Sequence, residues 1–246
     1  MSYLPIRLSF AGLTDVGLLR SANQDCYYLD PDGSLFVVAD GMGGHVGGQE
    51  ASRLATNAIR TYIEANTDLD HSPHSLLEQA IFTANEAVLA DQGAHPERAH
   101  MGTTVVILLV RDGQFWCAHV GDSRLYLMRE SKFVQITQDH TWVTQAIKDG
   151  TLSPEQSHSH PWRHVLSQCV GREDLNSIET QPVEIKPGDQ LLLCSDGLTE
   201  EVSDDAIMAC LQEIGSCEGQ VSALIEAAKA QGGRDNITAI AIAVSV

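Results

Sequence analysis

Two aspartates stand where an apolar run ends, and each precedes a glycine. Residues 35–39 lead into Asp40-Gly41, and residues 191–195 lead into Asp196-Gly197. Asp-Gly is a common turn dipeptide, and this chain contains five of them. Asp40 and Asp196 differ from the other three because a buried strand would hold each carboxylate rigidly. Hard divalent cations prefer such oxygen ligands, so a metal or phosphate site and a plain turn are both open interpretations.

The elements that must position these residues follow from the hydrophobic pattern. Apolar and β-branched runs predict strands at residues 6–14, 26–29, 35–39, 103–110, 115–120, 125–128, 133–136, 183–185, 191–194 and 237–246. Helical spacing predicts helices at residues 47–66, 75–90, 204–214 and 219–230. Paired helices that interrupt a strand-rich chain indicate sheets covered by helix pairs. We expect one domain over residues 1–246, with a lid or flap inserted at about residues 137–172, where His, Gln and Trp replace long apolar runs.

Composition excludes several classes of partner. The formal net charge of −18 over 246 residues disfavours nucleic acid and anionic membranes. No apolar stretch approaches the ~18 residues of a membrane span, and the N-terminus has no secretion-signal pattern. The six cysteines form no C-x-x-C pair, which favours reduced thiols and a cytoplasmic setting. We expect a cytoplasmic monomer. No cysteine lies in a loop that could bind an anion around its thiol, as a phosphatase with a catalytic cysteine would require.

Four further polar clusters stand at the ends of apolar segments. They are Arg20…Asn23-Gln24-Asp25, Gly102-Thr103-Thr104, Gly121-Asp122-Ser123-Arg124 and Gly233-Arg234-Asp235-Asn236. Together with the Asp40 and Asp196 segments, and in this order over about residues 12–246, they resemble the metal-dependent protein phosphatases of type 2C, the PPM serine/threonine phosphatases, in their compact bacterial form. The resemblance implies an α+β fold: a four-layer αββα sandwich of two central antiparallel β-sheets flanked by helix pairs.

The resemblance also implies a metal centre and a reaction. Asp40 would bridge two Mg²⁺ or Mn²⁺ ions, the Gly41 carbonyl would bind one of them, and Asp196 and Asp235 would complete the set. Asp122 with Asp196 would bind a third, weaker ion. A hydroxide bridging the two core ions would attack phosphoserine or phosphothreonine of a protein substrate directly, because such ions lower the pKa of bound water.

Other residues would bind substrate or support the metals. Arg20 matches the arginine that grips the substrate phosphate, as its planar donors suit phosphate oxygens. Asp25 matches a carboxylate that holds metal-bound water. Met42 stands where many eukaryotic members have a histidine, and His45 is a candidate for substrate contact instead. Gln24 replaces an acidic residue of many members, so one carboxylate that orients the ligands is missing.

Rival interpretations remain open. A catalytically silent phosphoprotein- or metal-binding member and a metal-dependent hydrolase of small phosphate esters would share the same motifs. Thr103 and Thr104 are interpreted as strand-packing residues, and His119, in an apolar strand, as a core histidine. A zinc set formed by His158, His160 and His164 is a minor hypothesis.

Overall fold

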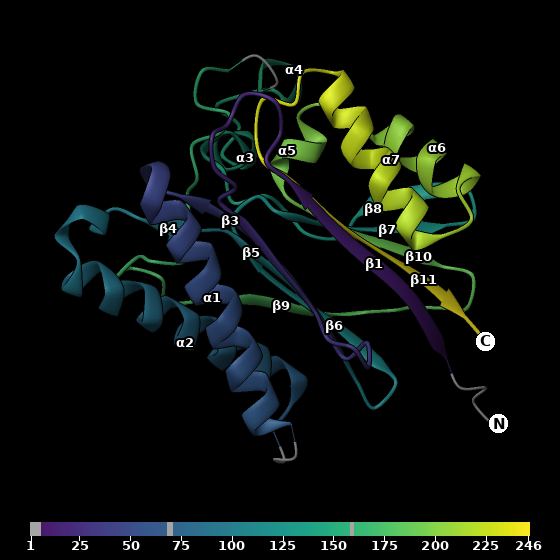
Figure 1. Ribbon diagram of the computed structural model, residues 1–246, viewed down its shortest axis with the longest axis horizontal. Coiled ribbons are helices and arrows are strands. Elements are labelled where there is room, and N and C mark those ends of the chain that lie inside the picture. Colours follow the sequence, from purple (N-terminus) through teal and green to yellow (C-terminus); the bar gives the residue numbers. More distant parts are fainter. Residues whose placement is uncertain (1–5, 68–70, 158–159) are drawn as a thin grey trace.

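The computed structural model describes residues 6–67, 71–157 and 160–246. Two antiparallel β-sheets pack face to face, and a pair of long helices covers the outer face of each (Figure 1). The first sheet has the order β1 (Arg7–Asp15), β11 (Ile237–Ser245), β10 (Gln190–Cys194), β7 (Arg124–Arg129) and β8 (Lys132–Gln135). The second has the order β2 (Asp25–Leu29), β3 (Leu35–Met42), β5 (Val105–Arg111), β6 (Gln114–Val120) and β9 (Glu179–Val183), with β4 (Gly102–Thr103) paired to β3.

The helices divide between the two sheets and one end of the molecule. The second sheet is covered by α1 (Gly44–Asn66) and α2 (Pro73–Ala94), the first by α6 (Asp204–Glu213) and α7 (Cys217–Ala230). A 3₁₀ turn, η1 (Pro96–Arg98), follows α2. Three short helices, α3 (Trp142–Lys148), α4 (Pro154–Ser157) and α5 (Asp196–Thr199), gather at one end of the sandwich beside the loop that follows β1 (Figure 1). None of the described helices is both long and apolar enough to cross a bilayer.

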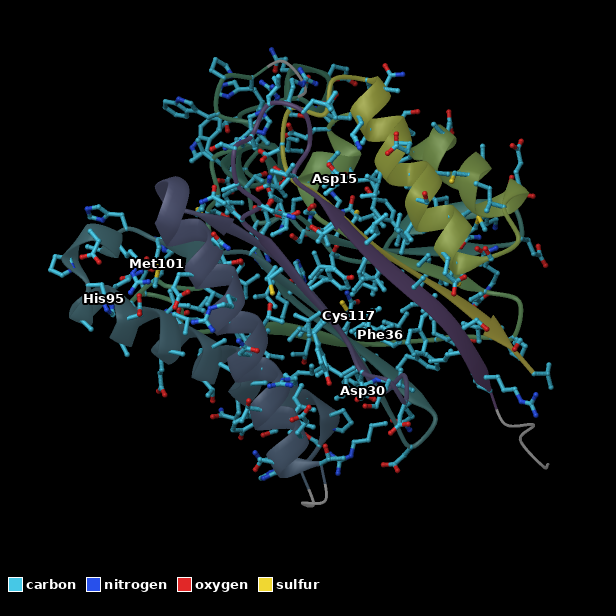
Figure 2. All side chains as sticks on the ribbon, viewed as in Figure 1. Asp15, Asp30, Phe36, His95, Met101 and Cys117 are labelled. Atoms are coloured by element: carbon cyan, nitrogen blue, oxygen red, sulfur yellow. The ribbon has the colours of Figure 1, made fainter. Side chains whose placement is uncertain are left out.

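Three hydrophobic cores separate the four layers. One lies between α1, α2 and the second sheet, and another between α6, α7 and the first sheet. The third lies between the two sheets, where Phe36 and Cys117 are buried (Figure 2). Alternate residues of a strand point to opposite faces, and therefore Phe36 belongs to the central core while Leu35 and Val37 belong to the helix-covered one. The predicted four-layer αββα fold is confirmed.

Most predicted elements are present, with three corrections. The strand predicted at 183–185 lies instead at Glu179–Val183. The strand was misplaced because Pro182 argues against a strand at this position in the sequence. In the structure β9 is an edge strand, where proline is tolerated. The strand predicted at 103–110 is interrupted at Thr104, which separates β4 from β5. The helix predicted at 47–66 begins earlier, at Gly44.

The topology brings the polar strand ends to one edge of both sheets. β3, β6 and β10 end there, and β2, β7 and β11 begin there. Because neighbouring strands are antiparallel, the end of one strand lies beside the start of the next. Residues that are far apart in the chain therefore meet at this edge.

Candidate active site

Asp25 links the two sheets. It opens β2, directly opposite Asp40 of β3. Its Oδ2 accepts hydrogen bonds from Ser195 Oγ at 2.8 Å, just past β10, and from Thr238 Oγ1 at 2.7 Å, in β11 of the first sheet. Its Oδ1 is buried and has no hydrogen-bond partner among the described residues. Burial, and then the charges of Asp196 and Asp235, raise the pKa of Asp25 to about 7 despite the two hydroxyl donors.

Two threonines fix the backbone of Asp40. The Asp40 N–H donates to Thr104 Oγ1 at 3.0 Å, and its carbonyl accepts from Thr103 Oγ1 at 2.8 Å and from the Thr104 N–H at 2.8 Å. Thr104 Oγ1 also lies 2.6 Å from Ser123 Oγ, in the turn that carries Asp122. Both threonines are buried, as strand-packing residues would be. The sequence analysis did not predict that these threonines hydrogen-bond to the Asp40 backbone. The only hint in the sequence was the Thr-Thr pair that follows Gly102.

Asp196 meets Asp40 across the cleft. It is the first residue of α5, separated by one residue from the end of β10 at Cys194, and it lines the same cleft as Asp40. Burial first, then the negative charge of Asp25 and of Asp196, raises the pKa of Asp40 well above its usual range. Burial also raises the pKa of Asp196. Buried carboxyl groups that repel one another need protons or a cation between them.

Asp122 occupies a tight turn between β6 and β7. Gly121 has φ 104°, a region that glycine tolerates. Burial, followed by the charges of Asp196 and Asp139, raises the pKa of Asp122 well above its usual range. Asp122 thus belongs to the same group of mutually repelling carboxylates.

Arg20 and Asp235 close the rim. The Arg20 Nη2 lies 2.6 Å from Asp235 Oδ2, and the arginine side chain is 49% exposed. The two loops that carry them are joined by backbone, because Leu18 N–H donates to Gly233 O at 2.7 Å. Asn236 reinforces this junction, with its Nδ2 donating to the carbonyls of Val16 and Ala22 at 3.0 Å.

Gly41 needs to be a glycine for steric reasons. A Cβ there would lie 2.0 Å from the carbonyl oxygen of Gly48 in α1, far inside van der Waals contact. Gln24 takes the place of an acidic residue that would orient metal ligands. Its Nε2 donates a hydrogen bond to the carbonyl of Gly44 and so holds the start of α1. Met42 and Gln24 both line the cleft. The side chain of His45 lies outside the described residues, so its predicted substrate contact stays a prediction.

One cleft collects most of the predicted site residues. It has a volume of about 670 Å³ and is lined by Arg20, Asp40, Gly41, Asp122, Asp196 and Asp235, among others. Asp25 lies behind Asp40 rather than in its wall. The arrangement is an acidic floor with two arginines, Arg20 and Arg172, among the residues that line the cleft. Such a floor can bind a phosphate dianion only through cations, because its own charges repel the ligand.

A histidine and a glutamate beside the cleft were not predicted together. His164 of the flap segment, residues 137–172, has its Nδ1 in contact with Oε1 of Glu200, which follows α5. Ligand atoms of His164, Asp196 and Glu200 lie within 4.8 Å of one another. Burial, and then the charge of Asp196, raises the pKa of Glu200 to about 7. The zinc set proposed from spacing is not formed by the described residues: His160 stacks on Trp142, and His158 lies outside the described part.

Comparison with known proteins agrees with this geometry. Residues 20–230 match the family model of protein phosphatase 2C. The serine/threonine protein phosphatase PstP of Mycobacterium tuberculosis is 36% identical over 243 residues, which is 98% of this chain and 46% of PstP. This chain therefore spans about half the length of that relative. Protein phosphatase PhpP of Streptococcus pneumoniae is 32% identical over 237 residues, covering 95% of this chain and 96% of PhpP.

Solved structures show the same fold. The crystal structure of the Mycobacterium tuberculosis phosphatase PstP/Ppp superimposes with a TM-score of 0.89 at 34% identity, covering 97% of this chain and 99% of that one. A structure of the PstP catalytic domain in complex with two manganese ions gives a TM-score of 0.87 at 32% identity, covering 98% and 100%. With the family model, the curated relatives and the solved structures in agreement over nearly the whole length, this chain belongs to the protein phosphatase 2C family.

Proposed function

We propose that this chain is a metal-dependent phosphoprotein phosphatase that hydrolyses phosphoserine and phosphothreonine. The gathering of Asp40, Asp122, Asp196 and Asp235 around one cleft carries the proposal. Buried carboxylates that repel one another form a strong site for divalent cations, which replace protons between them. The raised pKa values of Asp40, Asp122 and Asp196, all caused first by burial, support the same conclusion.

The residues present fit a metal centre of hard cations. Asp40, Asp196, Asp235 and the Gly41 carbonyl would hold two Mg²⁺ or Mn²⁺ ions, and Asp122 with Asp196 a third, weaker one. The donor set is all oxygen, as these ions prefer. Bound cations would neutralise the phosphate charge and supply an activated water for attack on phosphorus. The Oδ1 of Asp25, which has no hydrogen-bond partner among the described residues, would accept a hydrogen bond from such a water.

Arg20 would bind the substrate phosphate. Its guanidinium contacts Asp235, and a cation bound to that carboxylate would compete with this ion pair. The arginine would then be free to donate two parallel hydrogen bonds to phosphate oxygens. A half-exposed arginine on a loop can make this change without disturbing either sheet.

Metal removal tests the proposal. Activity on a phosphoserine peptide should fall to background after EDTA treatment and return with Mn²⁺ or Mg²⁺. Calorimetry on the chelated protein should count two strong sites and one weaker site. The Asp122→Ala variant should retain the two strong sites, lose the weak one and turn over more slowly.

Three results would contradict this function. Full activity after chelation would exclude metal dependence, and phosphate trapped on a cysteine would show a thiol mechanism. Activity confined to nucleotides or small esters in a side-by-side panel would favour the small-ester hydrolase instead. We further propose that residues 1–246 form one catalytic domain whose flap segment contacts protein substrates.

A further inference from the structure

A second cluster of metal-ligating side chains lies outside the carboxylate site. His119 of β6 stands opposite Glu179 of β9 in the strand ladder. The ring of His140, which follows β8, stacks on His119 with 4.5 Å between centroids and 23° between planes. Ligand atoms of these three residues lie within 4.8 Å of one another. None of the three lines the catalytic cleft.

His119 is oriented as a metal-binding histidine. Its Nε2 lies 2.8 Å from the backbone carbonyl of Gln138. A carbonyl only accepts, so Nε2 carries the proton and Nδ1 presents a lone pair. Ligating histidines are typically fixed by such a bond from the opposite ring nitrogen. The residue is 2% exposed, and burial lowers its pKa, which keeps the ring neutral as ligation requires.

His140 connects this cluster to the turn of Asp122. The backbone N–H of His140 donates to the Gly121 carbonyl at 3.0 Å, and the ring Nδ1 of His140 accepts from the backbone N–H of Gly121 at 3.2 Å. Burial, and then the neighbouring His119, lowers the pKa of His140 to about 4. The ring is therefore neutral near pH 7 and fastens the residue that precedes Asp122.

Metal binding at His140 is incompatible with its bond to Gly121. If Nδ1 binds the ion, its lone pair is no longer available to the Gly121 N–H. If Nε2 binds the ion, the neutral ring carries its proton on Nδ1, and two donors face each other. The stacked rings must also tilt before two lone pairs can converge on one ion. His140 is only half-buried, so it is the ring that can move.

We propose that His119, His140 and Glu179 form a site for a transition-metal ion of the Zn²⁺ class, and that its occupation loosens the Gly121–Asp122 turn. Two imidazoles and one carboxylate are a known zinc ligand set, and imidazole favours Zn²⁺ over Mg²⁺. The exposed Glu179 gives the ion a path from solvent. The site thus differs in metal preference from the all-oxygen catalytic centre. Loosening this turn would displace Asp122, a proposed metal ligand, and so inhibit turnover; this inhibition rests on the proposed phosphatase function.

The binding test uses the tag-free full chain saturated with Mg²⁺ and titrated with ZnCl₂ by calorimetry. Wild type should bind one Zn²⁺. Glu179→Gln should weaken this binding at least about 10-fold, because even an outer partner of a metal ligand contributes 10- to 100-fold. Glu184→Gln is the matched control, since Glu184 lies just past β9 and pairs with Lys186; it should bind like wild type. An isotherm that is absent, or identical in wild type and Glu179→Gln, overturns the site and assigns any Zn²⁺ to the catalytic carboxylates.

Two readouts test the coupling. The Gly121 amide resonance should shift on Zn²⁺ addition in wild type and shift only at higher concentration in Glu179→Gln. Inhibition of p-nitrophenyl phosphate hydrolysis by Zn²⁺ should move by the same factor. Zn²⁺ binding that leaves both the Gly121 signal and turnover unchanged overturns the coupling. The calorimetric and resonance measurements need no phosphatase activity, so their failure is distinct from failure of the proposed function.

Discussion

At the scale of single residues, Asp25 shows how this site is prepared for cations. One of its oxygens is held by two hydroxyl donors, while the other is buried without a partner among the described residues. A charged carboxylate in that position is unfavourable unless something positive or donating faces the second oxygen. Without a bound cation and its water, the charged form of Asp25 therefore destabilises the folded protein.

This instability predicts a pH effect on the chelated protein. The pKa of Asp25 is about 7 in the folded chain against 3.8 ordinarily. The folded state holds that proton more tightly than the unfolded state, so stability falls as pH rises from about 4 to about 7. Asp25→Asn should reduce this slope and be more stable than wild type above pH 7, by on the order of a few kcal/mol. Urea denaturation in EDTA from pH 4 to 8 measures it, and parallel curves for both proteins would contradict the assignment.

Asp40 and Arg20 should separate metal binding from substrate binding. Asp40→Ala should abolish turnover and metal binding together, because a ligand shared by both ions is lost. Arg20→Ala should keep its metals, since its Asp235 partner is released rather than removed. A hydrogen bond to a charged group contributes about 1.5–3 kcal/mol, so kcat/KM should fall roughly 10- to 150-fold. Calorimetry and steady-state kinetics measure the two effects.

Arg53→Ala is the control for Arg20→Ala. Arg53 is also half-exposed and also paired with an acidic residue, Glu50 of the same helix, but it does not line the cleft. Its kinetics and metal affinity should match wild type. Loss of metal from Arg20→Ala would show that this arginine supports the metal centre instead of the substrate.

At the scale of elements, the start of α1 is pressed against the end of β3. Gly41 and Gly48 approach so closely that a Cβ on Gly48 would lie 2.6 Å from the Gly41 carbonyl oxygen and 2.5 Å from Gln24 Nε2. The Gly41 carbonyl is the backbone atom proposed to bind a metal. A helix that follows its strand after a single residue, Gly43, can thus fix a ligand by backbone contact alone.

We expect Gly48→Ala to displace the Gly41 carbonyl. Inserting a methyl group into a packed contact typically costs about 1–3 kcal/mol, and metal affinity should fall with it. Gly93→Ala is the matched control, because its Cβ in α2 would meet nothing within 4 Å. That change should stabilise the chain by about 0.5–1 kcal/mol. Thermal unfolding with and without Mn²⁺ distinguishes them, and equal behaviour of the two variants would contradict the close-contact argument.

At the scale of the whole molecule, two sheets deliver acidic strand ends to one edge, and the flap segment borders it. The cleft is lined by His164, Val165 and Leu166 of this segment as well as by the carboxylates. An aromatic cluster of Trp142, His160 and Trp162 lies in the same segment. Trp162 is 54% exposed, which leaves apolar surface available to a protein substrate.

The flap segment should affect large substrates more than small ones. Contacts made only by a phosphoprotein stabilise only that substrate's transition state. Trp162→Ala should therefore lower kcat/KM for a phosphoprotein severalfold while leaving p-nitrophenyl phosphate hydrolysis nearly unchanged. Val134→Ala, an equally exposed apolar position on β8, serves as the control. Proportional losses for both substrates, with circular dichroism unchanged, would indicate that the flap only shapes the cleft.

The elements and the residues at their ends could be predicted from the sequence. Periods of two and of 3.6 residues come from backbone geometry, so strands such as β3 and β10 and helices such as α7 could be located locally. The placement of Asp40 and Asp196 at strand ends followed directly. The β9 strand was misplaced because Pro182 is acceptable only at an edge, and edge position is a property of the assembled sheet.

Which side chains contact one another could not be predicted from the sequence and depends on how the whole chain folds. Asp25 and Thr238 are 213 positions apart, and no spacing rule indicates that they share a hydrogen bond. The Arg20–Asp235 pair and the cluster of His119, His140 and Glu179 likewise join separate segments. Such contacts depend on sheet order, on the packing of one sheet over the other and on loop conformation. These features are set by the sum of many weak interactions over the whole chain, and local hydrophobic periodicity does not predict them.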